Sequence, residues 1–473
     1  MSTPDLTNQK KELELFAKRP KTFPKRVKGK YRRLKWIAMI MTLAIYYLVP
    51  FIRWDRGPGV PDQAVLIDLP ARRAYWFFIE IWPQEVYYLT AILVFAAIAL
   101  FFATALFGRV WCGYFCPQTV WTDLYVWVER IIQGDRNARK KLQEGPWSWE
   151  KAYKLTITHF IWLIIAWCTA GSFVLYFNDA PSLVRSFFDL NVSPTVLGFI
   201  GALTFSTYIM AGYAREQVCM YMCPYARFQS AMFDQDTLII GYDQERGEPR
   251  GKHKKGTSWE GRGHCIDCTA CVQVCPTGID IRKGLQMECI ACGLCVDACN
   301  DIMDRIGLDR GLIRYDTERN ILTGLDKFKL LRARTIYYAL ILCLVGGITL
   351  YGLLNRSPQE LHVLHDRNPL FVTLANGDIR NGYKIKILNK THDEKHYALS
   401  LNGINDFTIN LQGAGNPDKG DLVVAPDSVG QFRIFVSAPK QQSAQTDIYF
   451  AIEDLETHLK DEVKSVFISK VGR

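Results

Sequence analysis

The sequence predicts a multi-domain integral membrane protein with an α-helical membrane part, a cysteine-rich α+β segment and an all-β C-terminal part. Three observations support this: five long uncharged apolar stretches, two runs of four closely spaced cysteines, and a final region of short alternating segments. With 49% apolar residues and only 14 Cys in 473 residues, the chain is neither disordered nor a disulfide scaffold.

The five apolar stretches each hold 17 to 25 consecutive residues without a formal charge. A bilayer core needs about 20 mostly apolar residues in a helix. Buried helices of a soluble protein are the alternative, but five of this length and aromatic content favour a five-helix transmembrane bundle. The predicted helices lie at about 36–52, 86–108, 155–178, 190–214 and 335–355.

Basic residues in the connecting segments predict the orientation of these helices. Residues 1–35 hold 12 Lys and Arg, and residues 215–334 hold 18, whereas 179–193 holds only Arg185. Because cytoplasmic loops carry an excess of Lys and Arg, we expect the first two segments and 109–154 to be cytoplasmic. We expect the tail from Arg356 to lie on the outer side of the membrane. Membrane lipids then account for the net charge of +10, and we predict no nucleic-acid partner.

The strongest chemical signal is a C-x2-C-x2-C-x3-C run that occurs twice. Thiolates bind iron in this spacing, and in two-cluster ferredoxins the fourth cysteine of each run binds the other cluster. The sequence therefore predicts two 4Fe-4S clusters, one held by Cys265, Cys268, Cys271 and Cys299, the other by Cys275, Cys289, Cys292 and Cys295. Structural zinc is the alternative, but two intact runs of four disfavour it. We expect an α+β two-cluster (8Fe-8S) ferredoxin-like module at about 260–310, with βαββαβ-like topology.

A second motif, C-x-Y-x-C-P, also occurs twice, each time after a predicted membrane helix. It places Cys112 and Cys116 in one copy and Cys219 and Cys223 in the other. In a helix, residues four apart share a face, and four thiolates at the membrane surface suit Cu(I) or another soft metal. We predict that these four cysteines are the catalytic and copper-binding residues. Two other interpretations stay open: a redox disulfide, and simple packing of small buried residues.

Cys168 and Cys343 stand alone in apolar stretches, and we expect them to be packing residues.

The last segment, 356–473, loses the long apolar runs and gains short alternating ones. Turn signals punctuate these runs at about 8–12-residue spacing, which is typical of a β-sandwich. The predicted strands are 371–375, 383–389, 397–401, 407–411, 422–424, 431–436, 446–452 and 463–468. We expect an Ig-like domain without chemistry of its own, whose role the sequence leaves open.

With these parts in order, the sequence resembles the CcoG/FixG/RdxA family, accessory proteins for the maturation of cbb3-type cytochrome c oxidase. The resemblance rests on the basic N-terminus, five helices, both C-x3-C-P motifs, the eight ferredoxin cysteines and the Ig-like tail. It implies an oxidoreductase, a cupric reductase that supplies Cu(I) for the oxidase. It also implies several partners: a cytoplasmic electron donor, a copper chaperone or copper transporter, and cbb3-type oxidase assembly factors.

Two other functions remain compatible with the same residues. A quinol-oxidising membrane polyferredoxin subunit also combines C-x3-C-P motifs with ferredoxin clusters, and it would be reduced by quinol without responding to copper. A non-catalytic assembly scaffold or redox sensor would bind copper without reducing it.

Overall fold

The computed structural model describes residues 21–57, 59–253, 258–324, 328–412, 421–441 and 443–469. The chain divides into two compact units, one formed by residues 1–55 and 61–349 and the other by 56–60 and 350–473. Most of the predicted basic N-terminus, residues 1–20, lies outside the described residues. The two units are described separately below.

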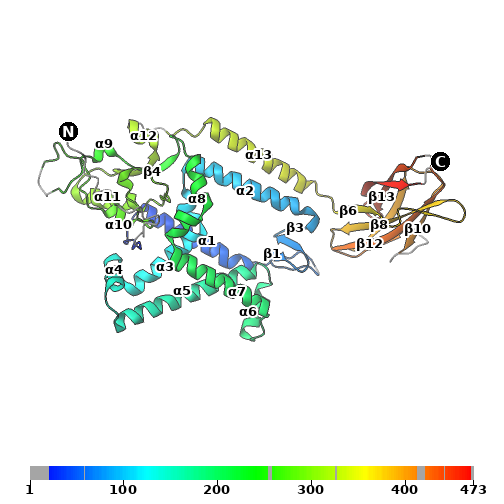
Figure 1. Cartoon of the computed structure of the whole chain (residues 1–473), viewed down its shortest axis with the longest axis horizontal. Coiled ribbons are helices and arrows are strands. Elements are labelled where there is room, and N and C mark those ends of the chain that lie inside the picture. The colour runs from blue at the N-terminus through cyan, green and yellow to red at the C-terminus, as the bar shows by residue number, and fades with distance from the viewer. Residues whose placement is uncertain are drawn as a thin grey trace, which may run out of the picture. The chain divides into compact units, whose positions relative to one another are not determined.

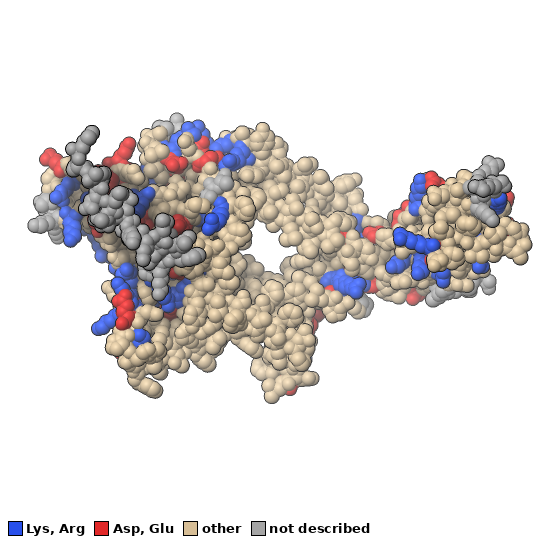
Figure 2. Space-filling view, in the orientation of Figure 1, with Lys and Arg blue, Asp and Glu red and all other residues tan. Residues whose placement is uncertain are grey.

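The first unit contains five helices that are long and apolar enough to cross a membrane, as the sequence predicts (Figure 1). They are α1 (Lys30–Leu48), α2 (Val86–Phe107), α5 (Trp149–Leu175), α7 (Pro194–Thr207, continued by a π-helix over Tyr208–Ala214) and α13 (Ala333–Leu354). Charged side chains gather over the part that carries α11 (Leu294–Ile306) and α12 (Glu318–Thr323) and at the start of α13, whereas the rest of α13 and α2 show none (Figure 2). This distribution suits helices that face lipid.

Helix α1 begins at Lys30, six residues before the predicted start at 36. Its first turns contain Arg32 and Lys35, which are buried although they are basic. Arg32 Nη1 lies 2.8 Å from Asp123 Oδ2, and Lys35 Nζ lies 4.0 Å from Asp123 Oδ1. A count of uncharged residues could not find this start, because a carboxylate from another helix neutralises the charges.

Several shorter elements of this unit lack a hydropathy signal and were not predicted. They are α3 (Pro117–Gln133), α4 (Arg136–Glu144), α6 (Ala180–Phe188) and an antiparallel sheet of β1 (Val65–Asp68), β2 (Arg73–Trp76) and β3 (Ile79–Ile81). Helix α3 matters most for the site, because Pro117 at its first turn directly follows Cys116.

The ferredoxin-like segment differs from the predicted βαββαβ topology. Its described residues contain one antiparallel strand pair, β4 (Leu238–Tyr242) and β5 (Ile313–Thr317), with α10 (Ala270–Val274) and α11 (Leu294–Ile306) between them. The strands lie outside the predicted limits of 260–310. Between the helices, Gly278 and Gly284 have positive φ angles, which interrupt a strand and leave an irregular loop.

The second unit is a sandwich of two antiparallel sheets. One contains β10 (Thr408–Gln412), β12 (Ser428–Ala438), β8 (Ile379–Asn389) and β6 (Gln359–His365), with β7 (Val372–Thr373) paired to β8. The other contains β11 (Asp421–Val424), β9 (Lys395–Asn402), β13 (Gln445–Asp454) and β14 (Lys460–Ile468). Alternate residues such as Ile385 and Phe450 are fully buried, as in a two-layer sandwich. All eight predicted strands are present; β6 was missed.

Within the first unit, the ferredoxin segment caps the first membrane helix. Asp297 of α11 accepts hydrogen bonds from the backbone N–H groups of Tyr31 (3.2 Å) and Arg32 (2.8 Å). A carboxylate at a helix N-terminus satisfies orphan N–H groups and complements the helix dipole. Asp297 lies between Cys295 and Cys299, so this cap joins the membrane helix to a predicted cluster ligand loop.

Asp297→Ala should destabilise this contact by about 1–2 kcal/mol, because buried N–H groups lose their acceptor. The measurement is thermal unfolding of the full chain in detergent with its clusters loaded, followed by the visible absorbance of the clusters. The matched control is Asp301→Ala, which removes an exposed carboxylate of the same helix and should change stability by less than about 0.5 kcal/mol. Equal midpoints for the two variants would contradict the cap.

Candidate functional site

The eight ferredoxin cysteines line two cavities of similar volume. One, of about 360 Å³, is lined by Cys265, Cys268, Cys271 and Cys299. The other, of about 350 Å³, is lined by Cys275, Cys289, Cys292 and Cys295, together with Cys271. Each cavity thus combines three cysteines of one run with the fourth of the other, which is the grouping that the crossed ligand scheme requires. The assignment of ligands itself stays a prediction.

The chemistry of these thiols fits iron–sulfur clusters. Burial raises the pKa of Cys271, Cys289 and Cys299 to about 12, so each thiol would stay protonated at neutral pH without a metal. Metal binding displaces such protons because the thiolate is the ligand. Apolar residues such as Ile279 and Ile281 line the second cavity, and they keep water from the sulfur atoms.

The two cavities differ in their access to solvent. Cys268 of the first cavity is exposed, whereas Cys289 and Cys292 of the second are buried. Cys271 lines both cavities and therefore links them. This arrangement offers a solvent-facing end at the first cavity and a protein-enclosed end at the second.

The two C-x3-C-P motifs form π-helical turns rather than the α-helical ends that the sequence predicted. The turns span Trp111–Phe115 and Val218–Met222. In each, the second cysteine donates its N–H to the carbonyl five residues earlier, from Cys116 to Trp111 and from Cys223 to Val218, both at 2.8 Å. The proline that follows begins the next helix and has no N–H to donate. Single π-turns of this kind are frequent at functional sites.

The structure brings the four motif cysteines close together. The pKa of Cys219 is raised to about 12, mainly by burial. The nearby charges of Cys116, Cys112 and Cys223 raise it further. Burial likewise raises the pKa of Cys112 to about 11, with smaller contributions from Cys116 and Cys223. The four cysteines therefore lie near enough to act on one another, and the buried thiols of Cys112 and Cys219 ionise only when a cation displaces their protons.

The first motif packs directly on the loop of the second cluster cavity. Cys112 shares an apolar core with Ile290 and Cys292, and the Tyr114 hydroxyl donates to the Cys292 carbonyl at 3.1 Å. Gly113 permits this approach. A Cβ atom there would lie 2.8 Å from the Ile290 carbonyl oxygen, which is too close for any side chain.

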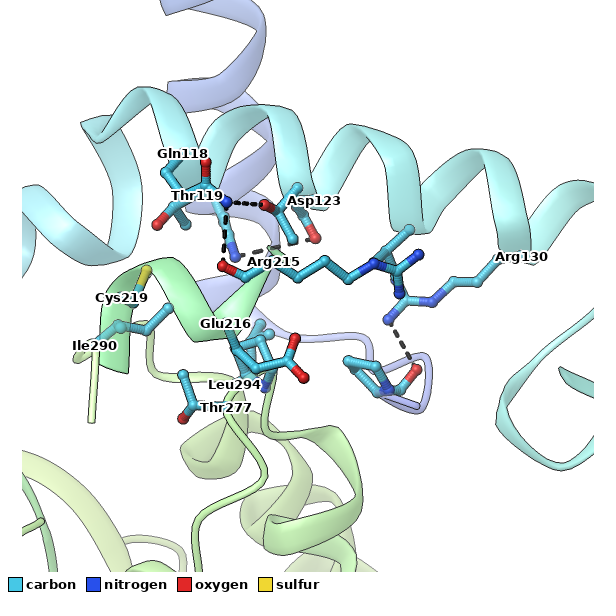
Figure 3. A pocket seen from close by; sticks show the side chains of 15 residues that line it. Gln118, Thr119, Asp123, Arg130, Arg215, Glu216, Cys219, Thr277, Ile290 and Leu294 are labelled. Atoms are coloured by element: carbon cyan, nitrogen blue, oxygen red, sulfur yellow. Dashed lines mark hydrogen bonds and ion pairs between the residues drawn. The ribbon is translucent and has the colours of Figure 1, made fainter. Parts of the chain in front are cut away.

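A pocket of about 490 Å³ lies between the second motif and the ferredoxin segment. Figure 3 shows Cys219 beside Ile290 at one end and Arg130 at the other. Polar residues of α3, including Thr119 and Asp123, form one side. The pocket therefore has one thiol of the four-cysteine site in its lining.

Sequence reasoning missed the residues that join the two sulfur sites. Gly113 and Asp297 were invisible because their roles depend on residues far away in the sequence. In the sequence, Arg109 was noted only as the residue that ends an apolar stretch. In the structure its guanidinium donates to the Cys289 carbonyl at 2.9 Å. The expected packing role of Cys168 and Cys343 is wrong, since both are exposed on membrane helices where lipid is the apolar neighbour.

Comparison with known protein families matches three parts of the chain. Residues 214–318 match a 4Fe-4S dicluster domain, and residues 349–470 match the IG-like fold at the C-terminal of FixG. Residues 89–134, which contain Cys112 and Cys116, match a 4Fe-4S binding domain. The predicted ferredoxin and Ig-like character of the chain is confirmed at this level.

Similar proteins cover almost the whole chain. The chain is 45% identical to the nitrogen fixation protein FixG of Rhizobium meliloti, over 96% of this chain and 93% of that protein. It is 44% identical to protein RdxA of Cereibacter sphaeroides, over 94% of this chain and 95% of that protein. A crystal structure of a FixG-related protein from Vibrio parahaemolyticus shares 30% identity, covers 24% of this chain and 99% of its own, and has a TM-score of 0.21.

The crossed ligand scheme predicts which cysteines share a cluster. Cys299→Ser should remove the same EPR signal of the reduced protein as Cys265→Ser, and it should spare the signal that Cys289→Ser removes. Iron content should fall from about eight to about four atoms per chain in each case. If Cys299→Ser and Cys289→Ser removed the same signal, each run would instead hold its own cluster.

Gly113→Ala should push the first motif away from the loop at Ile290, because the added methyl group has no room. We expect an altered EPR signal from the second cluster and a lower thermal midpoint. Gly171→Ala in α5 is the control, since a Cβ atom there meets nothing within 4 Å. Unchanged spectra and stability in Gly113→Ala would rule out the close contact.

Proposed function

This chain belongs to the FixG and RdxA family of membrane iron–sulfur proteins, and from that premise we propose that it is a cupric reductase. In this proposal it reduces Cu(II) to Cu(I) for the copper centre of a cbb3-type cytochrome c oxidase. The observation that carries the proposal is the common apolar core of Cys112 and Cys292. Through it, a four-thiol site adjoins the cavity of a cluster.

The ferredoxin cysteines would hold the two 4Fe-4S clusters, which supply single electrons when bound. The protein around them would exclude water and hold the ligands in place. Exposed Cys268 marks the end where a cytoplasmic electron donor would dock, and buried Cys289 and Cys292 mark the end toward the membrane. Cys271 lines both cavities and is the protein link that we propose between them.

Copper is the substrate at Cys112, Cys116, Cys219 and Cys223. Cu(II) prefers harder nitrogen and oxygen ligands, whereas Cu(I) prefers thiolates. A site built from four thiols therefore binds the reduced product more tightly than the oxidised substrate, which favours reduction of bound Cu(II). The pocket that Cys219 lines is the access path that we propose for the ion, and a copper chaperone or copper transporter would receive Cu(I).

The location that fits this function is the bacterial inner membrane, with the clusters on the cytoplasmic side and the Ig-like unit in the periplasm. Cytoplasmic placement gives the eight cluster cysteines reducing surroundings, in which thiols persist. Oxidase assembly factors are the partners that we propose for the Ig-like unit.

A quinol-oxidising electron-transfer subunit is the second candidate. The observation in its favour is a 24% identity to the ferredoxin-type protein NapH of Haemophilus influenzae, over 44% of this chain. In that case the four thiols would serve a different redox group, and copper would have no effect on turnover.

The test measures anaerobic reduction of Cu(II) by the full, cluster-loaded chain in detergent. A reductant other than dithionite supplies the electrons, and a colorimetric chelator detects the Cu(I) that forms. A variant with all four motif cysteines changed to Ser should keep its iron content but reduce Cu(II) no faster than a protein-free blank. The control is Cys168→Ser with Cys343→Ser, which changes two thiols outside the site and should keep full activity. Undiminished reduction by the four-serine variant, or rapid cluster reduction by quinol without any response to copper, would overturn the proposal.

A further inference from the structure

Arg109 is a buried cation whose hydrogen-bond acceptors are all neutral. Its side chain is 5% exposed. Nε lies 2.5 Å from Gln229 Oε1, and the terminal nitrogens donate to the carbonyls of Ala226 (2.7 Å), Cys289 (2.9 Å) and Met287. Among the residues that the structure describes, no carboxylate forms an ion pair with Arg109.

The internal repeat offers a direct comparison. Arg215 precedes the second motif much as Arg109 precedes the first, and it is also buried. Arg215 Nη2, however, lies 2.5 Å from the carboxylate of Glu129. Arg109 has hydrogen-bond acceptors but no counter-charge, so an anion nearby would offset part of the cost of burying its charge.

The Arg109 guanidinium is hydrogen-bonded to residues next to both sulfur sites. Gln229 Oε1 accepts from both Arg109 Nε (2.5 Å) and the Cys112 thiol (3.5 Å). Arg109 therefore contacts the backbone of a predicted cluster ligand and, through one amide, a thiol of the four-cysteine site.

We propose that Arg109 is the charge-compensating positioning residue of the four-thiol site, stabilising the anionic Cu(I)–thiolate product and the reduced state of the adjacent cluster. The inference rests on the proposed function in taking copper as the substrate. Thiolates outweigh the single charge of Cu(I), so the loaded site is anionic. Reduction makes it more negative by one unit, and a fixed cation therefore stabilises Cu(I) more than Cu(II).

The step that Arg109 favours is balanced as a one-electron transfer. Copper gains one electron at the expense of the reduced iron–sulfur centres of the same chain. The sulfur ligands keep their oxidation state, and Arg109 keeps its proton on both sides of the step. No proton donor is needed, and no covalent bond of the protein is broken.

Two variants cancel the positive charge of Arg109 in different ways. Arg109→Gln deletes the guanidinium. Gln229→Glu keeps Arg109 and its hydrogen bonds but places a carboxylate against it, so it tests charge even if Arg109→Gln does not fold. Arg109→Lys restores the charge, and Gln229→Met removes the shared acceptor without adding a charge.

The measurements use the full chain in detergent with its clusters loaded. One is the dissociation constant for Cu(I), obtained by competition with a chromogenic chelator. The other is the midpoint potential of each cluster without copper, from an EPR-monitored redox titration. Arg109→Gln and Gln229→Glu should each weaken Cu(I) binding about tenfold or more, the scale expected of one charge at short range in a partly buried site. Both should also make the potential of the second cluster more negative, and Arg109→Lys and Gln229→Met should remain closer to the wild type.

The outcomes separate this inference from the proposed function. If the wild type binds and reduces copper, but both charge-removing variants keep its Cu(I) affinity and cluster potentials, the role of Arg109 is overturned and the reductase remains. If the wild type neither binds nor reduces copper, the reductase and the copper role of Arg109 both fail. A lowered cluster potential in Gln229→Glu would then still support charge compensation of the cluster.

Discussion

The contact between the first C-x3-C-P turn and the loop of the second ferredoxin run is the constraint on which the rest of the structure depends. Gly113 makes it possible, because a side chain there would collide with the backbone at Ile290. The Tyr114 hydroxyl then reaches the Cys292 carbonyl, and Cys112 enters the core of the loop. Without this approach, the four-thiol site and the cluster cavities would be separate features of one chain. With it, they form a continuous series of sulfur sites.

Buried charged residues lie along the same contact between the membrane helices and the ferredoxin segment. Asp297 caps the first membrane helix from within a cysteine run, and Asp123 neutralises the basic residues of that helix's first turns. These interactions hold polar groups in an apolar setting because each charge has a partner. Among the described residues Arg109 has no ion pair, and it lies where anionic sulfur is expected. The distribution of paired and unpaired charge is therefore a stronger guide to the site than the net charge of the chain.

Much of this organisation could be predicted from the sequence, because its signals are local. Uncharged apolar stretches predicted the five membrane helices, alternating residues predicted eight strands of the sandwich, and cysteine spacing predicted the two groups that the cavities bring together. The contact between the first C-x3-C-P turn and the loop of the second ferredoxin run could not be predicted. It joins residues such as Tyr114 and Cys292, which are 178 positions apart. The π-turns were also missed, because the spacing of the motif cysteines was taken for one α-helical turn.

The account's central claim is that electrons pass from the clusters to copper at the four thiols of the same chain. The most direct test is a single turnover. The full chain is reduced anaerobically, freed of reductant and mixed with Cu(II), while cluster absorbance and chelated Cu(I) are followed together. The account predicts that the clusters are oxidised as Cu(I) appears, with one Cu(I) formed for each electron that they lose. Clusters that stay reduced in the presence of Cu(II), or Cu(I) that appears without cluster oxidation, would contradict it.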